Sequence, residues 1–191
     1  MSGSLRERKP GVTAAMRLDA LGLQHERALG LFLEAFARAG EKRIPAFLLP
    51  TDWPHTRIVE VLSAWARGEQ LPQGWVPSTT WFLYRGEAIV AVANLRHRLC
   101  PALVRCGGHV GYSVVPGERG RGRATFLLET VKRHARAMGH ARLLLTCDEQ
   151  NHASSRVIEK CGGALVPASA GEQGAPEILR YWIELAPSAA S

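Results

Sequence analysis

The sequence predicts an α/β (α+β) fold in which a central mixed sheet is covered by helices. Between residues 79 and 115 the apolar residues follow the pattern of strands, and a tight turn at Arg85-Gly86-Glu87 joins the first two of them. A strand, a helix, a second strand and a second helix then follow each other between residues 108 and 161. Antiparallel hairpins around a strand–helix–strand–helix core indicate a mixed sheet with helices packed on it.

The chain has 191 residues, of which 46% are apolar, and this is enough for one domain with a full core. We expect that domain over residues 11–186, between flexible tails at 1–10 and 187–191. No stretch approaches the roughly 18 uncharged apolar residues of a spanning helix, and the charged N-terminus lacks the apolar core of a secretory signal. We therefore expect a cytoplasmic protein. Its four cysteines form no C-x-x-C pair or zinc pattern, so we expect packed thiols and no metal.

The first half of the chain predicts a strand over residues 12–18 and two helices. The first helix, over residues 24–39, ends at Gly40 and has one apolar face, formed by Leu29, Phe32, Phe36 and Ala39. The second helix begins at Trp53 behind a Thr51-Asp52 cap, with Pro54 in its first turn, and ends at Gly68. A loop over residues 70–77 separates it from the strands.

The strands of the second half are expected at residues 79–84, 88–95 and 108–115, with a polar interruption over 96–107. The next helix keeps one apolar face as far as Met138 and ends at Gly139; this face holds Ala124, Leu127, Leu128, Val131, Ala135 and Met138. A buried strand at 142–147 and a helix at 151–161 follow. The last expected elements are strands at 164–167 and 178–185, joined by a loop over 169–176.

The most informative segment joins the strand that ends at Pro116 to the helix that follows it. It reads Arg119-Gly-Arg-Gly-Arg-Ala124. The start of a helix offers free backbone N–H groups and the positive end of the helix dipole. Glycines let that backbone approach a bulky anion, and the arginine side chains add fork-shaped donors for phosphate oxygens. The segment fits a pyrophosphate, although a solvated surface loop is the plain alternative. It matches neither a Walker loop nor the dinucleotide fingerprint.

On these residues the sequence resembles the Gcn5-related N-acetyltransferase (GNAT) superfamily. Arg119-x-x-Gly122-x-Ala124 is similar to that superfamily's coenzyme A signature, and the strands and helix around it, from Gly108 to Gly163, are similar to its core. More loosely, residues 79–97 and 180–185 look like a bacterial branch of predicted acetyltransferases. The resemblance implies a mostly antiparallel central sheet with two splayed central strands, and acetyl-CoA as the acyl donor.

The resemblance also implies a role for individual residues. The pantetheine arm would pair with the backbone of Val114 and Val115, between the splayed strands. Asn151 would contact the pantetheine, with Ser154 close to the coenzyme, although Asn151 also fits a helix N-cap. The pyrophosphate would be bound by the backbone N–H groups of Arg119, Gly120, Arg121, Gly122, Arg123, Ala124 and Thr125.

The catalytic groups are less defined by the resemblance. Many relatives carry a tyrosine that protonates the leaving thiolate, at the position where this chain has Ile158. Either the thiolate leaves unassisted or another residue donates a proton to it. Tyr112 is the nearest candidate for this acid in the sequence. A base would assist the attack of the acceptor amine. His109 is the first candidate for this base, ahead of His97 and Glu34. A purely structural role is the alternative for His109. A nucleophilic Cys147 is disfavoured by its apolar strand.

The function predicted from this reasoning is direct transfer of an acetyl group from acetyl-CoA to an amine on a small molecule or a peptide. A GNAT-like module that senses acyl-CoA without turnover is the alternative. The formal charge of +7 also suits nucleic acid, but no matching motif is present. The acceptor site is expected between the first two helices and residues 96–107, where several cations suit a carboxylate or phosphate, or form a solvated face: Arg96, His97, Arg98 and Arg105. The sequence leaves open whether the protein forms a homodimer, and no membrane partner is expected.

Overall fold

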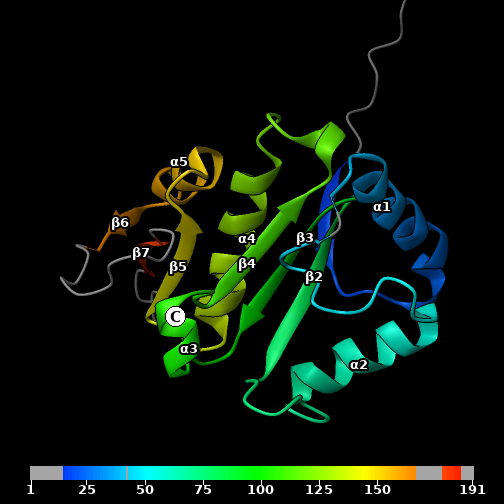
Figure 1. The fold of residues 1–191 in the computed structure, drawn as a ribbon, viewed down its shortest axis with the longest axis horizontal. Helices are drawn as coiled ribbons and strands as arrows, with labels where there is room; N and C mark the ends of the chain where they lie inside the picture. The colour runs from blue at the N-terminus through cyan, green and yellow to red at the C-terminus, as the bar shows by residue number, and fades with distance from the viewer. Residues whose placement is uncertain (1–14, 42, 167–177, 186–191) are drawn as a thin grey trace, which may run out of the picture.

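The computed structural model describes residues 15–41, 43–166 and 178–185, and it consists of two antiparallel sheets with helices on both sides (Figure 1). The first sheet has the order β1-β2-β3-β4, and the second has the order β5-β7-β6. The expected tails at 1–10 and 187–191 and the expected loop at 169–176 lie outside the described residues. Within the described residues, no helix combines the length and apolar character needed to cross a membrane.

The N-terminal half supplies the outer strand β1 and the helices of one face. These elements are β1 (Met16–Asp19), the 3-10 turn η1 (Leu23–His25), α1 (Glu26–Arg38) and α2 (His55–Arg67). Gly40, two residues after the end of α1, and Gly68, directly after α2, adopt positive φ angles of 74° and 80°, as expected for glycine terminators. The predicted start of the second helix is wrong by two residues. Pro54 is extended and forms the N-cap, because a residue that precedes proline, here Trp53, disfavours helical geometry.

The centre of the molecule is formed by β2 (Ser78–Arg85), β3 (Ala88–Arg96) and β4 (Val110–Val114). Arg85 pairs with Ala88 across the predicted tight turn, so the hairpin is confirmed. A short helix, α3 (Pro101–Arg105), occupies the segment that was expected to be irregular. It buries none of its residues, and therefore has no apolar stripe that could have predicted it.

The C-terminal half follows the predicted order closely. It contains η2 (Pro116–Glu118), α4 (Arg123–Ala137), β5 (Arg142–Asp148), α5 (His152–Lys160), β6 (Gly163–Leu165) and β7 (Ile178–Glu184). The expected burial of Met138 is wrong: its exposed fraction is 43%, because α4 ends at Ala137 and the chain turns away at Gly139.

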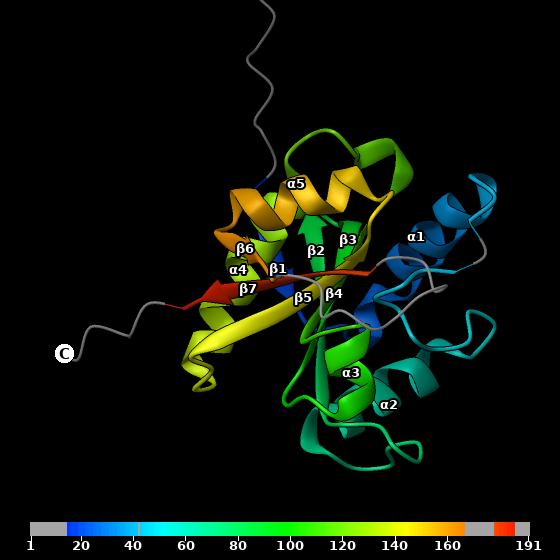
Figure 2. The same cartoon turned by 60° about the vertical axis from the view of Figure 1, so that its left-hand side comes forward.

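Two apolar clusters hold the layers together. One lies between the sheets, α4 and α5, and includes Leu127, Leu128, Val131, Leu143 and Ile183. The other lies on the opposite face of β2 and β3, under α1 and α2, and includes Phe32, Phe36, Ile58 and Phe82. Figure 2 shows α1 and α2 on the side of the sheet opposite to α4 and α5. The boundary between β4 and β5 therefore lies at the centre of the molecule, between the two layers of helices.

Candidate active site

The strands β4 and β5 lie next to each other, and among the described residues hydrogen bonds join them only at one end, through Gly107 and His109. The Gly107 N–H donates to Oγ1 of Thr146 at 2.8 Å. His109, just before β4, donates its backbone N–H to the Leu144 carbonyl at 2.7 Å, and the Leu144 N–H donates to Nδ1 of His109 at 2.8 Å. Beyond this point the described residues form no ladder between the two strands. The strands splay apart beyond the junction, as the family resemblance implied, and we call this opening the wedge.

Glycine makes the junction possible. Gly108 has a φ of 57°, and a Cβ atom added to it would lie 2.4 Å from the Leu144 carbonyl oxygen. Only a residue without a side chain allows the two backbones to approach so closely. The closed end of the wedge is therefore specified by the Gly108-His109 pair.

A cavity of about 280 Å³ occupies the wedge. Its walls come from β4, β5, the start of α5 and the segment around α3. Its lining includes Arg96, Gly111, Tyr112, Thr146, Asp148, Asn151 and Ser154. The cavity thus brings together three predicted site residues, Tyr112, Asn151 and Ser154. Thr146 and Asp148 were not predicted, because the only indication in the sequence was their place at the end of a buried strand.

The free edge of β4 offers backbone groups to this cavity. The N–H of Val115 donates to the Val90 carbonyl at 3.0 Å, and its carbonyl accepts from Glu118. Hydrogen bonds alternate in an antiparallel ladder, so the neighbouring Val114 directs its N–H and carbonyl away from β3 and toward the wedge. The Val114 carbonyl accepts from Nε of Arg119 at 3.1 Å. Of the two predicted backbone contacts, Val114 therefore retains one free group, its N–H, while both groups of Val115 already bond within the protein.

Tyr112 crosses from β4 to α5 inside the wedge. Its hydroxyl lies 2.8 Å from Oγ of Ser154. Burial raises the pKa of Tyr112 to about 12, although the hydrogen bond with Ser154 lowers it in part. The phenol therefore keeps its proton at neutral pH and is available as a hydrogen-bond donor.

Asn151 forms the N-cap of α5, as one of its two expected roles requires. Its Oδ1 accepts the backbone N–H of Ser154 at 3.1 Å. The cap fixes the first turn of α5 against the cavity and so places Ser154 beside Tyr112. Asn151 also lines the cavity, which leaves its predicted contact with the pantetheine compatible with the cap.

His109 is buried at the closed end of the wedge, where it contacts the rings of His140 and Trp182. Burial lowers its pKa to about 4, with smaller contributions from His140 and Arg96. Its Nδ1 accepts from Leu144, so the neutral ring carries its proton on Nε2 and has no free lone pair. This geometry favours a positioning role, while its role as a base stays a prediction.

The other predicted bases lie outside the wedge cavity. His97 contacts Oγ1 of Thr79 at 2.8 Å, and burial lowers its pKa. Glu34 is paired with Arg38 on the exposed side of α1. In contrast, Cys147, which was considered as a nucleophile, lines the cavity, and its Sγ lies 3.4 Å from Oγ of Ser155.

The loop between β4 and α4 presents unused backbone donors. Gly120 and Gly122 adopt φ angles of 71° and 73°, and nothing lies within 4 Å of a Cβ added at either glycine. Among the described residues, no protein acceptor takes the backbone N–H groups from Gly120 to Thr125. These amides lie at the N-terminus of α4, where the helix dipole favours an anion.

The arginine side chains of this loop are mostly engaged by carboxylates. Arg119 forms a double hydrogen bond with Glu41, at 2.7 and 2.8 Å, which lowers the pKa of the Glu41 carboxyl. Arg123 donates to Glu118 at 3.1 Å, and Glu118 also accepts from Arg85. Arg121 is more exposed and lies 3.8 Å from Glu118. Arg121 is therefore the cation of this loop that is most available to a phosphate. The carboxylates of Glu41 and Glu118, which hold the other two arginines, could not be predicted from the sequence pattern.

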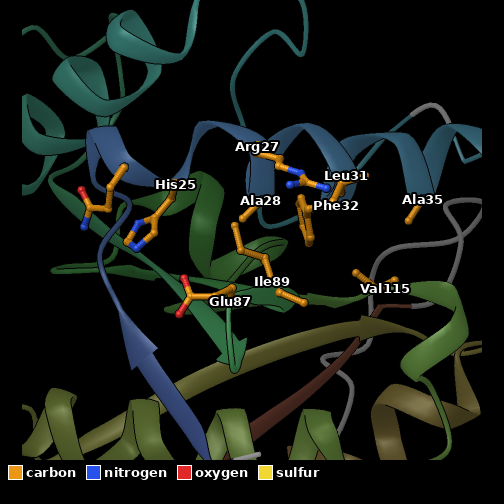
Figure 3. Close-up of a pocket in the computed structure, with 11 residues that line it drawn as sticks. His25, Arg27, Ala28, Leu31, Phe32, Ala35, Glu87, Ile89 and Val115 are labelled. Atoms are coloured by element: carbon orange, nitrogen blue, oxygen red, sulfur yellow. The ribbon is translucent and has the colours of Figure 1, made fainter.

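A larger cavity, of about 440 Å³, lies between α1 and the β2–β3 hairpin (Figure 3). In that view His25 and Glu87 lie at one end of the groove and Val115 at the other, with Ile89 between them. Its lining is mainly apolar and includes no residue of β5 or α5. This groove is therefore separate from the wedge and from the loop amides.

An antiparallel sheet opened at its centre and flanked by helices on both faces places the protein in the class of acetyltransferase folds. The chain belongs to the acetyltransferase (GNAT) family, whose model matches residues 48–163. The match includes the wedge, the loop and α5. No curated protein sequence matches the chain.

Solved acetyltransferases share the fold at low sequence identity. The yncA protein of Salmonella typhimurium, solved with acetyl-CoA, has a TM-score of 0.57 and 18% identity, covering 92% of this chain and 97% of its own. RimL, the ribosomal L7/L12 α-N-protein acetyltransferase in complex with coenzyme A, has a TM-score of 0.61 and 15% identity, with coverages of 91% and 96%. An N-acetyltransferase of Staphylococcus aureus Mu50 has a TM-score of 0.58 and 16% identity, with coverages of 90% and 99%.

Proposed function

We propose that this protein is an N-acyltransferase that transfers the acetyl group of acetyl-CoA directly to an amine. The observation that carries the proposal is a set of unused backbone donors, interrupted at Val115, Glu118 and Arg119, whose N–H groups bond within the protein. It begins at the Val114 N–H in the wedge and continues with the amides from Gly120 to Thr125. A thioester with a pantetheine arm and a pyrophosphate needs donors in this arrangement. Membership of the GNAT family and the coenzyme complexes of similar folds support the same donor.

In this proposal the loop amides bind the pyrophosphate, and the side chain of Arg121 adds charge. Arg119 and Arg123 act through their carboxylate partners, which hold the loop in shape. The pantetheine arm lies along Val114, next to Asn151 and Ser154. The thioester carbonyl then lies near Tyr112, in a cavity that contains both polar and apolar walls.

The neutral amine attacks the thioester carbonyl and forms a tetrahedral oxyanion. The attacking nitrogen loses its proton to water, the carbon–sulfur bond then breaks, and the thiolate of coenzyme A leaves. In this proposal the Val114 N–H donates to the oxyanion as it forms. With a pKa of about 12, Tyr112 is a weaker acid than a free thiol, whose pKa is about 8.5. Tyr112 therefore stabilises the departing thiolate by donating a hydrogen bond rather than by transferring its proton completely.

Two measurements test the function. The first follows thiol release from acetyl-CoA in the presence of amino acids, polyamines, aminoglycosides and peptides, and we expect release above the amine-free rate with at least one class. The second measures coenzyme A affinity by calorimetry for the Gly122→Val variant. Gly122 has a positive φ, so a β-branched residue strains the loop and covers its amides. We expect affinity to fall by more than tenfold, consistent with the loss of about 1.4 kcal/mol or more.

The matched control is Gly117→Ala, in the same segment. Gly117 has no positive φ, and nothing lies within 4 Å of an added Cβ. Its affinity should stay within twofold of the wild type. Equal affinity of the Gly122→Val variant and the wild type would show that the coenzyme binds elsewhere.

One observation favours a second function, an acyl-CoA-binding module without turnover. Ile158 replaces the tyrosine that many family members carry, and it is completely buried in the core. A protein with this function would bind acetyl-CoA with an affinity that depends on Gly122, but no amine would accelerate thiol release. The two measurements above therefore separate the two functions.

A further inference from the structure

Arg96, the last residue of β3, brings a positive charge into the wedge cavity. Its backbone N–H donates to the His109 carbonyl at 2.8 Å, which places it level with the closed end of the wedge. Its guanidinium lies over Gly111 of β4, where a Cβ atom would come within 3.7 Å of both Nη1 and Nη2. Because Gly111 has no side chain, the guanidinium remains in contact with the cavity that both residues line.

The charge of Arg96 has no anionic partner in the described part of the chain. Nη1 donates to the neutral carbonyls of Gly107 and Gly108, at 2.9 and 3.4 Å. In contrast, Arg85, Arg119 and Arg123 all form ion pairs with glutamates. Burial lowers the pKa of Arg96, although a guanidinium stays charged at neutral pH. Arg96 is half-buried, and a cation partly withdrawn from water without a counter-ion is costly, so a bound anion would relieve this cost.

The remaining walls limit which anion fits. Among the described residues that line the cavity, Arg96 is the only cation and Asp148, the last residue of β5, is the only carboxylate. Arg96 lies level with the closed end of the wedge and Asp148 at the opposite end of β5. One positive and one negative group match a small zwitterion, whereas a phosphate dianion would meet the repulsion of Asp148 with only one cation to balance it. The cavity of about 280 Å³ also lies at the small end of ligand sites.

We propose that the acceptor is a small amino carboxylate, such as a free amino acid, and that Arg96 binds its carboxylate. This inference rests on the proposed acyltransferase function and names the acceptor class of the same site. The carboxylate accepts hydrogen bonds from Nη2 and Nε, since Nη1 is already engaged by two carbonyls. The amine is then directed along the wedge toward Tyr112 and the thioester, and Arg96 is a specificity-determining residue.

The experiment uses matched acceptors and two variants. Leucine, phenylalanine and methionine are each tested as the free amino acid, the amino acid amide and the decarboxylated amine, and kcat/KM is measured by thiol release. A charged hydrogen bond contributes about 1.5–3 kcal/mol, so we expect the wild type to favour the free acid by about tenfold to a hundredfold. Arg96→Gln, which keeps an amide donor for the Gly107 carbonyl, should abolish this preference and leave the KM for acetyl-CoA unchanged.

Arg98→Gln is the matched control, because Arg98 is exposed, lies two residues away and does not line the cavity. It changes the net charge equally and should retain the preference. Calorimetric titration of the coenzyme-A-saturated wild type with the same acids and amines gives a readout that needs no turnover and no variant.

The proposal is overturned if the free acids bind or react no better than their amides, if peptides are the better acceptors, or if Arg96→Gln retains the preference. The proposed function is judged separately. It survives when an uncharged amine or a peptide accelerates thiol release, and it fails when acetyl-CoA is bound but no amine is acetylated.

Discussion

Acidification should destabilise the closed end of the wedge through His109. Burial lowers the pKa of this imidazole from 6.5 to about 4 in the folded protein. Between these two pH values the unfolded chain binds a proton at His109 and the folded protein does not, so the free energy of unfolding falls as the pH falls. The stabilisation is fully present above pH 6.5 and is lost by about pH 4. At about 1.4 kcal/mol per pH unit, the interval corresponds to roughly 3 kcal/mol.

The assay is urea unfolding followed by tryptophan fluorescence, at pH values from 7.5 to 4. His109→Asn is the informative variant, because its Oδ1 can accept the Leu144 N–H but its side chain does not titrate. The packing lost in His109→Asn should lower the stability of the variant equally at every pH. Other groups, such as His97 and His140, titrate in the variant as they do in the wild type. Wild type should therefore lose about 3 kcal/mol more than the variant over the acid range. Parallel curves would show that burial does not keep His109 neutral, and the positioning role would lose its main support.

Two further outcomes follow from the same contacts. Tyr112→Phe should lower kcat by about tenfold to a hundredfold while the KM for acetyl-CoA changes less than twofold, because a hydrogen bond to the departing thiolate is made mainly in the transition state. Tyr181→Phe, which alters a buried tyrosine outside the cavity, should retain kcat, and equal kcat in both variants would exclude Tyr112 from the chemistry. Gly108→Ala should lower the free energy of unfolding by about 2–4 kcal/mol, since its Cβ would lie 2.4 Å from the Leu144 carbonyl oxygen. In the same denaturation assay Gly30→Ala, in the open middle of α1, should be neutral or slightly stabilising, and a harmless Gly108→Ala would contradict the close approach.

Local patterns predicted most of the elements of this fold. The β2–β3 hairpin and the helix α4 were predictable because their turn residues and apolar spacing lie within a few positions of each other. The short helix α3 was not, since none of its residues is buried. The position of β7 between β5 and β6 could not be predicted from the sequence either, because strand order depends on pairings between distant segments.

The site divides in the same way. The loop at the start of α4 and the cap formed by Asn151 are local features, and both could be predicted from the residue types and their spacing. Long-range pairs could not be: Glu41 reaches Arg119 across 78 positions of the chain. Residues 96–107 were expected to shape the acceptor site, which stays a prediction, but no pattern indicated that Arg96 would lie over Gly111.

The single junction between β4 and β5 determines how the two halves of the proposed site relate. If the strands were paired along their length, the Val114 N–H would bond to β5 and no donor would face a thioester. If the two strands did not meet at all, residues 97–109, which join β3 to β4, would lack their bonds to β5 at the closed end of the cavity. Because the bonds to β5 are confined to Gly107 and His109, the edge of β4 stays open beyond them and the end where Arg96 lies is still closed. Side chains alternate along β4, so Gly111 admits Arg96 on one face and Tyr112 reaches Ser154 on the other. A shift of the junction by one residue would exchange these faces, and this explains why the close approach at Gly108 matters for chemistry as well as for stability.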